Sequence, residues 1–261
     1  MMRALWTSAS GMNAQQKNLD TISNNLANVN TAGFKRVRAE FHDLLYQTLA
    51  APGSGTSNTT ETPNGIQIGL GSKVVATNRL FDQGSLKNTN RSLDLAITGS
   101  GFFQVTLPDG TAGYTRDGSF TLDATGQLVT SQGYLLNPNI TIPQETRSIV
   151  IGTDGTVTAD TGDANLQNLG QINLSTFINP SGLKAMGGNI YQETNASGAP
   201  VTGVPGSPGI GEIQSNFLES SNVDVAEEMI NLIIGQRAFE VTSRSVRTAD
   251  TVLGEITGLK R

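Results

Sequence analysis

The first thirty residues carry apolar side chains at the spacing of one helix face. Apolar residues recur every seven positions, and two more each follow a member by three. The members of this N-terminal seam are Leu5, Met12, Leu19, Ile22, Leu26 and Val29. This spacing predicts a helix with one narrow apolar stripe. The stop signal Asn30-Thr31-Ala32-Gly33 follows it, with Gly33 as the expected left-handed C-cap.

The last forty residues repeat the pattern, after an expected cap at Ser221-Asn222. The seven-residue positions and their neighbours are Val225, Met229, Leu232, Ile233, Phe239, Val246, Leu253 and Ile256. A heptad sustained over five repeats predicts packing of one helix on another. Gly235 lies inside this helix, where a glycine costs about 1 kcal/mol relative to alanine.

The two seams lie at opposite ends of the chain and share a period, so we expect the terminal helices to pack together as a coiled-coil-like pair. The gain from burying so narrow a seam is small beside the entropy of ordering both helices. One interpretation is an intramolecular helix pair that packs on the core of the same chain. Completion of the seam by further copies of the chain is the other, and the polar residues at the +4 positions of the C-terminal heptad, Gln236, Ser243 and Asp250, favour it.

Between about residues 69 and 191 the apolar period changes to two, which is typical of β-strands. The expected strands are 93–98, 102–107, 119–122, 127–131, 148–151, 156–160 and 171–177. The expected hairpin turns are Asp109-Gly110, Asp117-Gly118, Thr125-Gly126, Gln132-Gly133 and Asp154-Gly155. The sequence therefore predicts an α+β fold, in which a central, mainly antiparallel β domain is inserted between the two terminal helices.

The segments that flank this β region are less regular. Residues 34–46 suit an extended segment or a short helix, residues 50–65 form a polar stretch expected to be a flexible loop, and residues 195–211 are rich in Pro and Gly. The predicted domains are a helical core (1–33 and 222–261), an extended connecting region with a flexible insertion near 46–65 (34–75 and 195–221), and a β domain (76–194).

Composition narrows the function classes. The net charge is −5 and the 17 basic residues are scattered, which argues against a nucleic-acid partner. There is no cysteine, so disulfides and thiolate metal sites are excluded. The N-terminus lacks the apolar core of a cleaved secretory signal, and no apolar run is long enough to insert into a membrane.

Residues that could carry chemistry have simpler interpretations. His42 is the one histidine and has no cysteine beside it, so a zinc site is not expected. A glycosidase needs two carboxylates, and the candidates are Asp94, Asp109, Asp117 and Asp123. Asp109 and Asp117 directly precede glycines, as turn residues do, and Asp94 lies within a strand pattern. Asp123 and Asp160 lack the regular ligand series of a calcium loop. We therefore expect no enzyme activity, no metal and no cofactor.

Five stretches together resemble the bacterial flagellar rod and hook axial proteins. The terminal ones are SASGMNAQQKNLDTISNNLANVNTAGFK and ESSNVDVAEEMINLIIGQRAFEVTSRSVRTADTVL; the internal ones are LDLAITGSGFFQV, YTRDGSF and NPSGLKAMGGNIYQETNASGAP. The resemblance covers nearly the whole chain. It implies a structural protein that self-assembles helically into the rigid distal part of the rod of the flagellar basal body, transmits torque and lines the export channel.

The resemblance also implies partners and a location. The expected partners are other copies in a helical polymer, proximal rod and hook-type axial proteins, the surrounding basal-body rings and the flagellar type III export apparatus. The protein would span the periplasm after export without a cleaved signal. Both seams, apart from Ile256, become the expected assembly interface. A segment implied to stiffen the rod carries Tyr46, Pro52, Glu61, Pro63 and Gly65.

Two alternatives stay open at this point. The chain resembles other rod or hook members of the same family, which would give it a different place in the same axis. From a different class, a periplasmic β domain that binds or cleaves glycan, with helices that only dimerise it, would share the same element order.

Overall fold

The computed structural model describes residues 2–52, 55–57, 60–61, 64–162 and 166–258. The chain divides into two compact units. The helical unit comprises Met1–Leu26, Val37–Asn78 and Asp224–Arg261, and the β unit comprises Ala27–Arg36 and Arg79–Val223. This division differs from the predicted connecting region, because 37–78 groups with the helices and 195–221 groups with the β unit.

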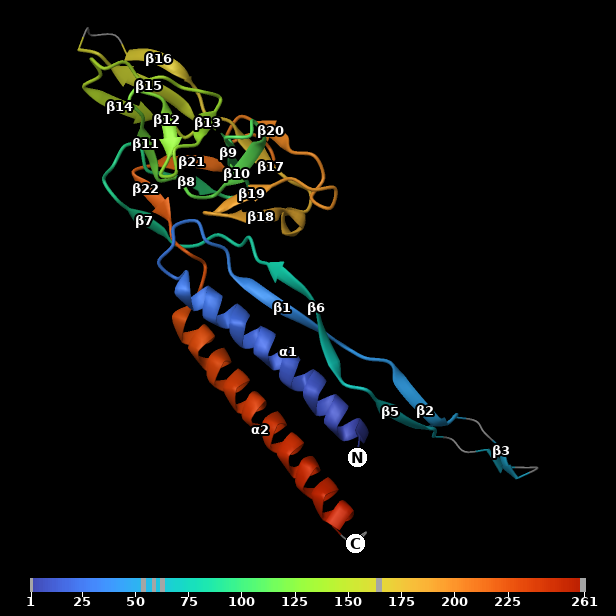
Figure 1. Ribbon diagram of the computed structural model, residues 1–261. Helices are drawn as coiled ribbons and strands as arrows, with labels where there is room; N and C mark the ends of the chain where they lie inside the picture. Colours follow the sequence, from blue (N-terminus) through green and yellow to red (C-terminus); the bar gives the residue numbers. More distant parts are fainter. Residues whose placement is uncertain (1, 53–54, 58–59, 62–63, 163–165, 259–261) are drawn as a thin grey trace. The chain divides into compact units, whose positions relative to one another are not determined.

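The helical unit contains two long helices, α1 (Met2–Ala27) and α2 (Val225–Gly258), which pack together as the sequence predicts (Figure 1). Its strands are β1 (Val37–Asp43), β2 (Tyr46–Ala50), β3 (Gly55–Ser57), β4 (Thr60–Glu61), β5 (Ile66–Gly69) and β6 (Ser72–Arg79). They pair as β1–β6, β2–β5 and β3–β4. We call residues 37–78 the arm. Of the two alternatives for residues 34–46, an extended segment or a short helix, the structure shows the extended one. Residues 50–65, which were expected to be a flexible loop, contain β3 and β4.

The ends of both helices differ from the sequence prediction. The cap of α2 is Asp224 instead of Ser221-Asn222: its Oδ1 accepts the amide hydrogens of Ala226 and Glu227, at 2.8 and 3.3 Å. Helix α1 ends at Ala27, so Val29 lies in the turn that follows and not on the helix.

Gly33 has the positive φ expected of a C-cap, +68°, but it lies six residues beyond α1. Its amide donates to the carbonyl of Glu219 at 2.8 Å. A Cβ at this position would meet the backbone carbon of Arg116 at 2.7 Å. Gly33 is therefore required by close backbone packing inside the β unit and not by a helix end, which corrects the prediction.

The β unit is built from short strands that pair antiparallel (Figure 1). They are β7 (Leu86–Asn88), β8 (Leu95–Thr98), β9 (Phe102–Thr106), β10 (Ala112–Thr115), β11 (Phe120–Leu122), β12 (Leu128–Thr130), β13 (Leu135–Asn137), β14 (Ser148–Ile151), β15 (Thr156–Asp160), β16 (Leu166–Gln171), β17 (Leu174–Thr176), β18 (Lys184–Gly187), β19 (Ile190–Gln192), β20 (Val201–Gly203), β21 (Glu212–Ser215) and β22 (Phe217–Glu219), with a 3-10 turn at Pro180–Gly182. The α+β prediction is confirmed.

The largest sheet of the described residues runs β11-β12-β13-β9-β10-β19-β18, and β17 joins it by pairing with β9 and β20. Strands β14, β15 and β16 form a second sheet. The final strands return to the start of the unit, because β21 pairs with β8 and β22 pairs with β7. The strands that close the β unit, β21 and β22, are therefore its last strands in the sequence.

Four of the five predicted hairpin turns join paired strands. Gly110, Gly126, Gly133 and Gly155 all have positive φ, as tight hairpins favour. The prediction at Asp117-Gly118 is wrong, because β10 and β11 do not pair with each other. A Cβ on Gly118 would collide with the carbonyl of Leu95, so this glycine permits a close backbone approach.

The core of the β unit has two parts. The larger one is mainly aliphatic and includes the fully buried Leu95, Ile97 and Val157. The smaller one is aromatic: the rings of Tyr114 and Phe177 meet edge to face at 4.8 Å between centroids. Both cores lie entirely within the β unit.

Candidate assembly surface

Helices α1 and α2 pack antiparallel, and contacts spread along their length fix the register. Near the start of α1 the hydroxyls of Ser8 and Ser245 lie 3.4 Å apart. Near its end Nδ2 of Asn25 donates to Oε2 of Glu228 at 3.3 Å. The predicted pairing of the terminal seams is therefore realised within one chain.

Asn25 also holds the arm against α1. Its side chain is buried, its Nδ2 donates to the carbonyl of Val37 at 2.8 Å, and its Oδ1 accepts the amide of Val37 at 2.9 Å. A single amide thus satisfies both backbone groups of the first residue of β1. Sequence patterns did not single out Asn25, since no periodic signal marks one asparagine of α1 as a bridge.

Gly235 leaves room on α2 for the side chain of Leu19 on α1. The residue is buried, and a Cβ there would meet Cδ2 of Leu19 at 2.9 Å. At Gly11 the corresponding contact is Cγ2 of Thr242 at 3.4 Å. The helix-propensity cost of Gly235, counted from sequence as a loss, is offset by the packing of Leu19.

The predicted interface residues do not all lie in the α1–α2 seam. Ile22 is buried, and the half-buried members on the helices are Leu5, Met12, Leu19, Leu26, Leu232, Phe239, Val246 and Leu253. Val29 is half-buried in the turn after α1 and belongs to neither helix face. Val225, Met229 and Ile233 are exposed. The structure therefore assigns the two sets to different faces of the helix pair.

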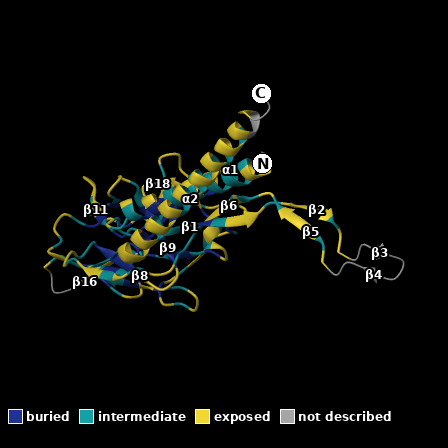
Figure 2. Ribbon diagram, turned by 90° about the horizontal axis from the view of Figure 1, so that it is seen from below, coloured by how far each residue is buried: buried dark blue, intermediate teal, exposed yellow. Residues whose placement is uncertain are grey.

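The exposed set belongs to a second apolar stripe, which the sequence analysis only partly found. The first three turns of α2 expose Val225, Met229, Ile230, Ile233 and Ile234, which we call the outer stripe. Ile230 is 58% exposed and Ile234 61%. At about 100° per residue, the stripe points roughly opposite to Glu228 and Gly235, which face α1. Figure 2 shows the exposed colour along this helix. Helix α2 is thus apolar on two sides.

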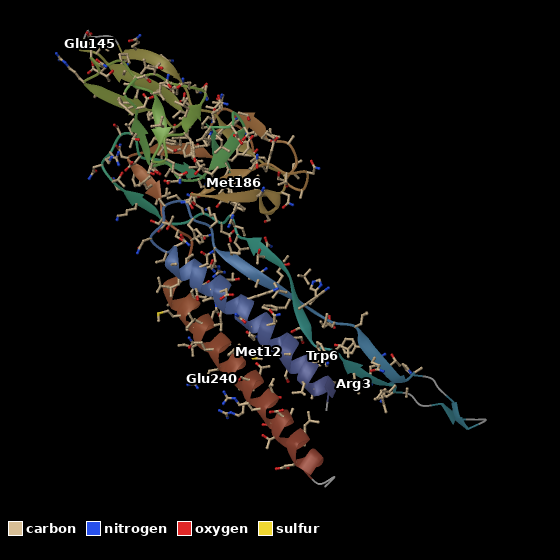
Figure 3. All side chains as sticks on the ribbon, in the orientation of Figure 1. Arg3, Trp6, Met12, Glu145, Met186 and Glu240 are labelled. Atoms are coloured by element: carbon tan, nitrogen blue, oxygen red, sulfur yellow. The ribbon has the colours of Figure 1, made fainter. Side chains whose placement is uncertain are left out.

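Two further exposed apolar residues were not predicted. Trp6 on α1, labelled in Figure 3, is 73% exposed, and Val241 on α2 is 66% exposed. Val241 borders a groove of about 600 Å³ whose walls include Ala14, Phe41 and Ala238. The sequence does contain a signal for the outer stripe, the adjacent pair Ile233-Ile234. Neighbouring residues on a helix point about 100° apart, so only one of the two can lie in a single heptad seam.

The arm exposes apolar residues of its own. In the β2–β5 register Gln47 lies opposite Ile68, and an irregularity in the pairing follows at Leu49; Leu49 and Ile68 are both exposed. Tyr46 covers Gly69, since a Cβ on Gly69 would lie 3.3 Å from its ring. A two-stranded ribbon with exposed apolar residues is marginal in water and favours a partner.

The predicted stiffening residues are described only in part. Pro52 lies beside Gly65, whose Cβ would meet Cδ of Pro52 at 2.7 Å, at the end of the β2–β5 pair. Glu61 belongs to β4, but its side chain lies outside the described residues, as does all of Pro63.

Asp109 and Asp123, two of the aspartates considered for catalysis, serve as turn residues. Asp109 accepts the Thr111 hydroxyl at 2.7 Å and its amide at 3.0 Å, and these bonds lower the pKa of the Asp109 carboxyl. Asp123 is held in the same way, chiefly by the amide of Gln127 and the hydroxyl of Thr125, and its pKa is also lowered. A lowered pKa keeps a carboxyl ionised, which is the opposite of what a general acid needs.

Within the described ranges, no group of three or more His, Asp or Glu side chains is placed to hold a metal ion. A search of the same ranges finds no helix apolar and long enough to cross a bilayer.

Three family models match the chain in order. Residues 5–35 match the model described as flagella basal body rod protein, residues 96–159 the flagellar hook protein FlgE/F/G D1 domain, and residues 214–259 the flagellar basal body rod FlgEFG protein C-terminal. These matches define the class as flagellar rod and hook proteins.

Full-length relatives narrow the class. The flagellar basal-body rod protein FlgG of Borreliella burgdorferi is 52% identical over 100% of both chains, and FlgG of Bacillus subtilis is 44% identical over 100% of both. The chain belongs to the family of flagellar basal-body rod proteins. A solved structure, flagellar hook protein FlgE2 of Helicobacter pylori, is a distant likeness: 15% identity, a TM-score of 0.25, 70% of this chain and 56% of that chain. The resemblance seen in the sequence is confirmed, and nothing found supports the glycan alternative.

Proposed function

We propose that this chain is the repeating subunit of the rigid distal rod, a helical polymer that transmits torque and lines the export channel. Membership of the basal-body rod family supports a structural role in the basal body. Further copies, the proximal rod and hook-type proteins, the surrounding rings and the type III export apparatus are its proposed partners. It spans the periplasm and reaches it without a cleaved signal.

The observation that carries this proposal is the outer stripe. Five apolar residues on three turns of one helix form the kind of contiguous patch that marks a protein contact. Ile230 and Ile234 are already partly covered in one chain, so burying the remainder contributes about 1 kcal/mol each. A stripe facing away from α1 binds a neighbour without disturbing the helix pair. The seam residues of the pair then support the contact from behind.

Gold-labelled antibody against the protein tests its place in the cell. On basal bodies isolated from its own cells, the label should lie on the rod between the inner rings and the hook. Label on the hook, or on the cell envelope away from basal bodies, would contradict the proposal.

Removing residues 50–65 tests the role of the arm. We expect polymers of the deleted chain to form and to bend more than the full-length ones, because the arm loses the end of its two-stranded ribbon and with it contacts to neighbouring subunits. Electron microscopy of negatively stained polymers gives the persistence length, which should fall by at least about twofold.

A chain in which Gly-Ser residues replace 51–64 at unchanged length is the matched control. It separates the loss of side chains from the loss of length. Polymers of the deleted chain that are as straight as the full-length ones would refute the stiffening role while leaving the outer stripe untouched.

A further inference from the structure

Lys35 is buried completely, next to the point where the chain leaves the β unit for the arm. Its side chain is 0% exposed. Nζ donates to Oε1 of Glu219 at 2.7 Å and to the carbonyl of Asp82 at 2.6 Å. Lys35 ends the N-terminal stretch that carried the family resemblance, yet the assembly surface makes no use of it.

A second buried cation shares the same carboxylate. Arg116, 3% exposed, donates from one guanidinium nitrogen to Oε2 of Glu219 at 3.3 Å and from the other to the carbonyl of Gly99 at 2.6 Å. Its Nε has no partner among the described residues. Burial lowers the pKa of the Lys35 ammonium and of the Arg116 guanidinium, and Glu219 opposes both shifts. One carboxylate therefore offsets two cations.

The surrounding backbone converges on the same place. Oε1 of Glu219 also accepts the amide of Gly84 at 2.9 Å, and the carbonyl of Glu219 accepts the amide of Gly33 at 2.8 Å. Three residues on, the side chain of Asn222 accepts the Arg36 amide at 2.7 Å and donates to the carbonyl of Leu80 at 3.0 Å. Three of the four boundaries between the two units, at 36/37, 78/79 and 223/224, lie within a few residues of this cluster.

The two cations of the cluster come much earlier in the sequence than the carboxylate that pairs with them. Lys35 and Arg116 precede Glu219 by 184 and 103 residues. Until β22 pairs with β7 and brings Glu219, closing the β unit would bury two cations without a buried counter-charge, which is strongly unfavourable. The Asp82 carboxylate also favours the charged form of Lys35, but Asp82 is exposed.

We propose that Glu219 is a latch: the base of the β unit closes over Lys35 and Arg116 only when the last strand arrives. The β unit therefore closes only when its last strand, β22, is present. Closure places the segment around Lys35 beside the segment around Glu219. The latch holds in a free monomer and does not depend on the proposed function.

The test is hydrogen exchange on the full-length Glu219→Gln variant, which keeps the shape and acceptor oxygen and removes the charge. We expect protection in 33–36, 80–86 and 114–120 to fall by on the order of a hundredfold. The sheet β14–β16 should keep its protection and serves as the internal control. Unchanged protection at the latch would overturn the proposal.

A second variant decides the outcome if Glu219→Gln unfolds the whole unit. Adding Lys35→Met removes one of the two uncompensated cations. The latch predicts that the double variant regains protection relative to Glu219→Gln alone, whereas a cluster that only fills space predicts a further loss. Failure of the double variant to recover would refute the latch.

Discussion

Replacing Ile234 with Asp should abolish polymer formation and leave the monomer folded. The Ile234 side chain is 61% exposed in the single chain, so a carboxylate there remains hydrated and costs the monomer little. In a polymer that buries the outer stripe, the same carboxylate would lose its water without gaining a partner. The expected penalty is several kcal/mol per contact, which raises the concentration needed for assembly by at least about a hundredfold.

Ile178→Asp is the matched control. Ile178 is 89% exposed and belongs to the β unit, so the chemical change is the same and the place is different. Sedimentation and electron microscopy measure polymer, and circular dichroism verifies the fold. If Ile234→Asp forms polymers at the wild-type concentration, the outer stripe is not an assembly contact.

Gly235→Phe should separate the helix pair. A Cβ at Gly235 already meets Leu19 at 2.9 Å, and because Leu19 is flexible a single methyl group could be accommodated. An aromatic ring cannot, so α1 and α2 should lose about 1–3 kcal/mol of packing locally. Because the outer stripe depends on a straight, supported α2, polymer formation should fail as well.

Gly254→Phe provides the comparison on the same helix. A Cβ at Gly254 would meet nothing within 4 Å, so the ring points into open space. The thermal unfolding of the helical unit, followed by the fluorescence of Trp6, should drop for Gly235→Phe and stay within a few degrees of wild type for Gly254→Phe. Equal behaviour of the two variants would show that Gly235 has no special packing role.

Local chemistry made much of the fold predictable. The hairpins at Gly110, Gly126, Gly133 and Gly155 followed from turn dipeptides that require positive φ, and the terminal helices followed from their heptads. Predictions failed where a glycine serves distant packing: Gly33 and Gly118 resemble a cap and a turn in sequence, but both admit backbone from elsewhere in the β unit.

The functional surfaces were harder to predict for the same physical reason. A single heptad period assigns all the apolar residues of α2 to one face. The structure shows two faces, because Leu232 is half-buried whereas the adjacent Ile233 is exposed. The bridge made by Asn25 and the pairing of Lys35 with Glu219 join residues far apart in the chain. Such contacts leave no periodic trace, so sequence patterns do not reveal them.

The most direct test of the account is an electron cryomicroscopy map of the assembled polymer at side-chain resolution. The account predicts that Ile230 and Ile234 of each α2 are buried against a neighbouring copy, with α1 and α2 of each chain still paired through Leu19 and Gly235. A map in which the outer stripe faces water, while subunits touch only through the β units, would contradict it.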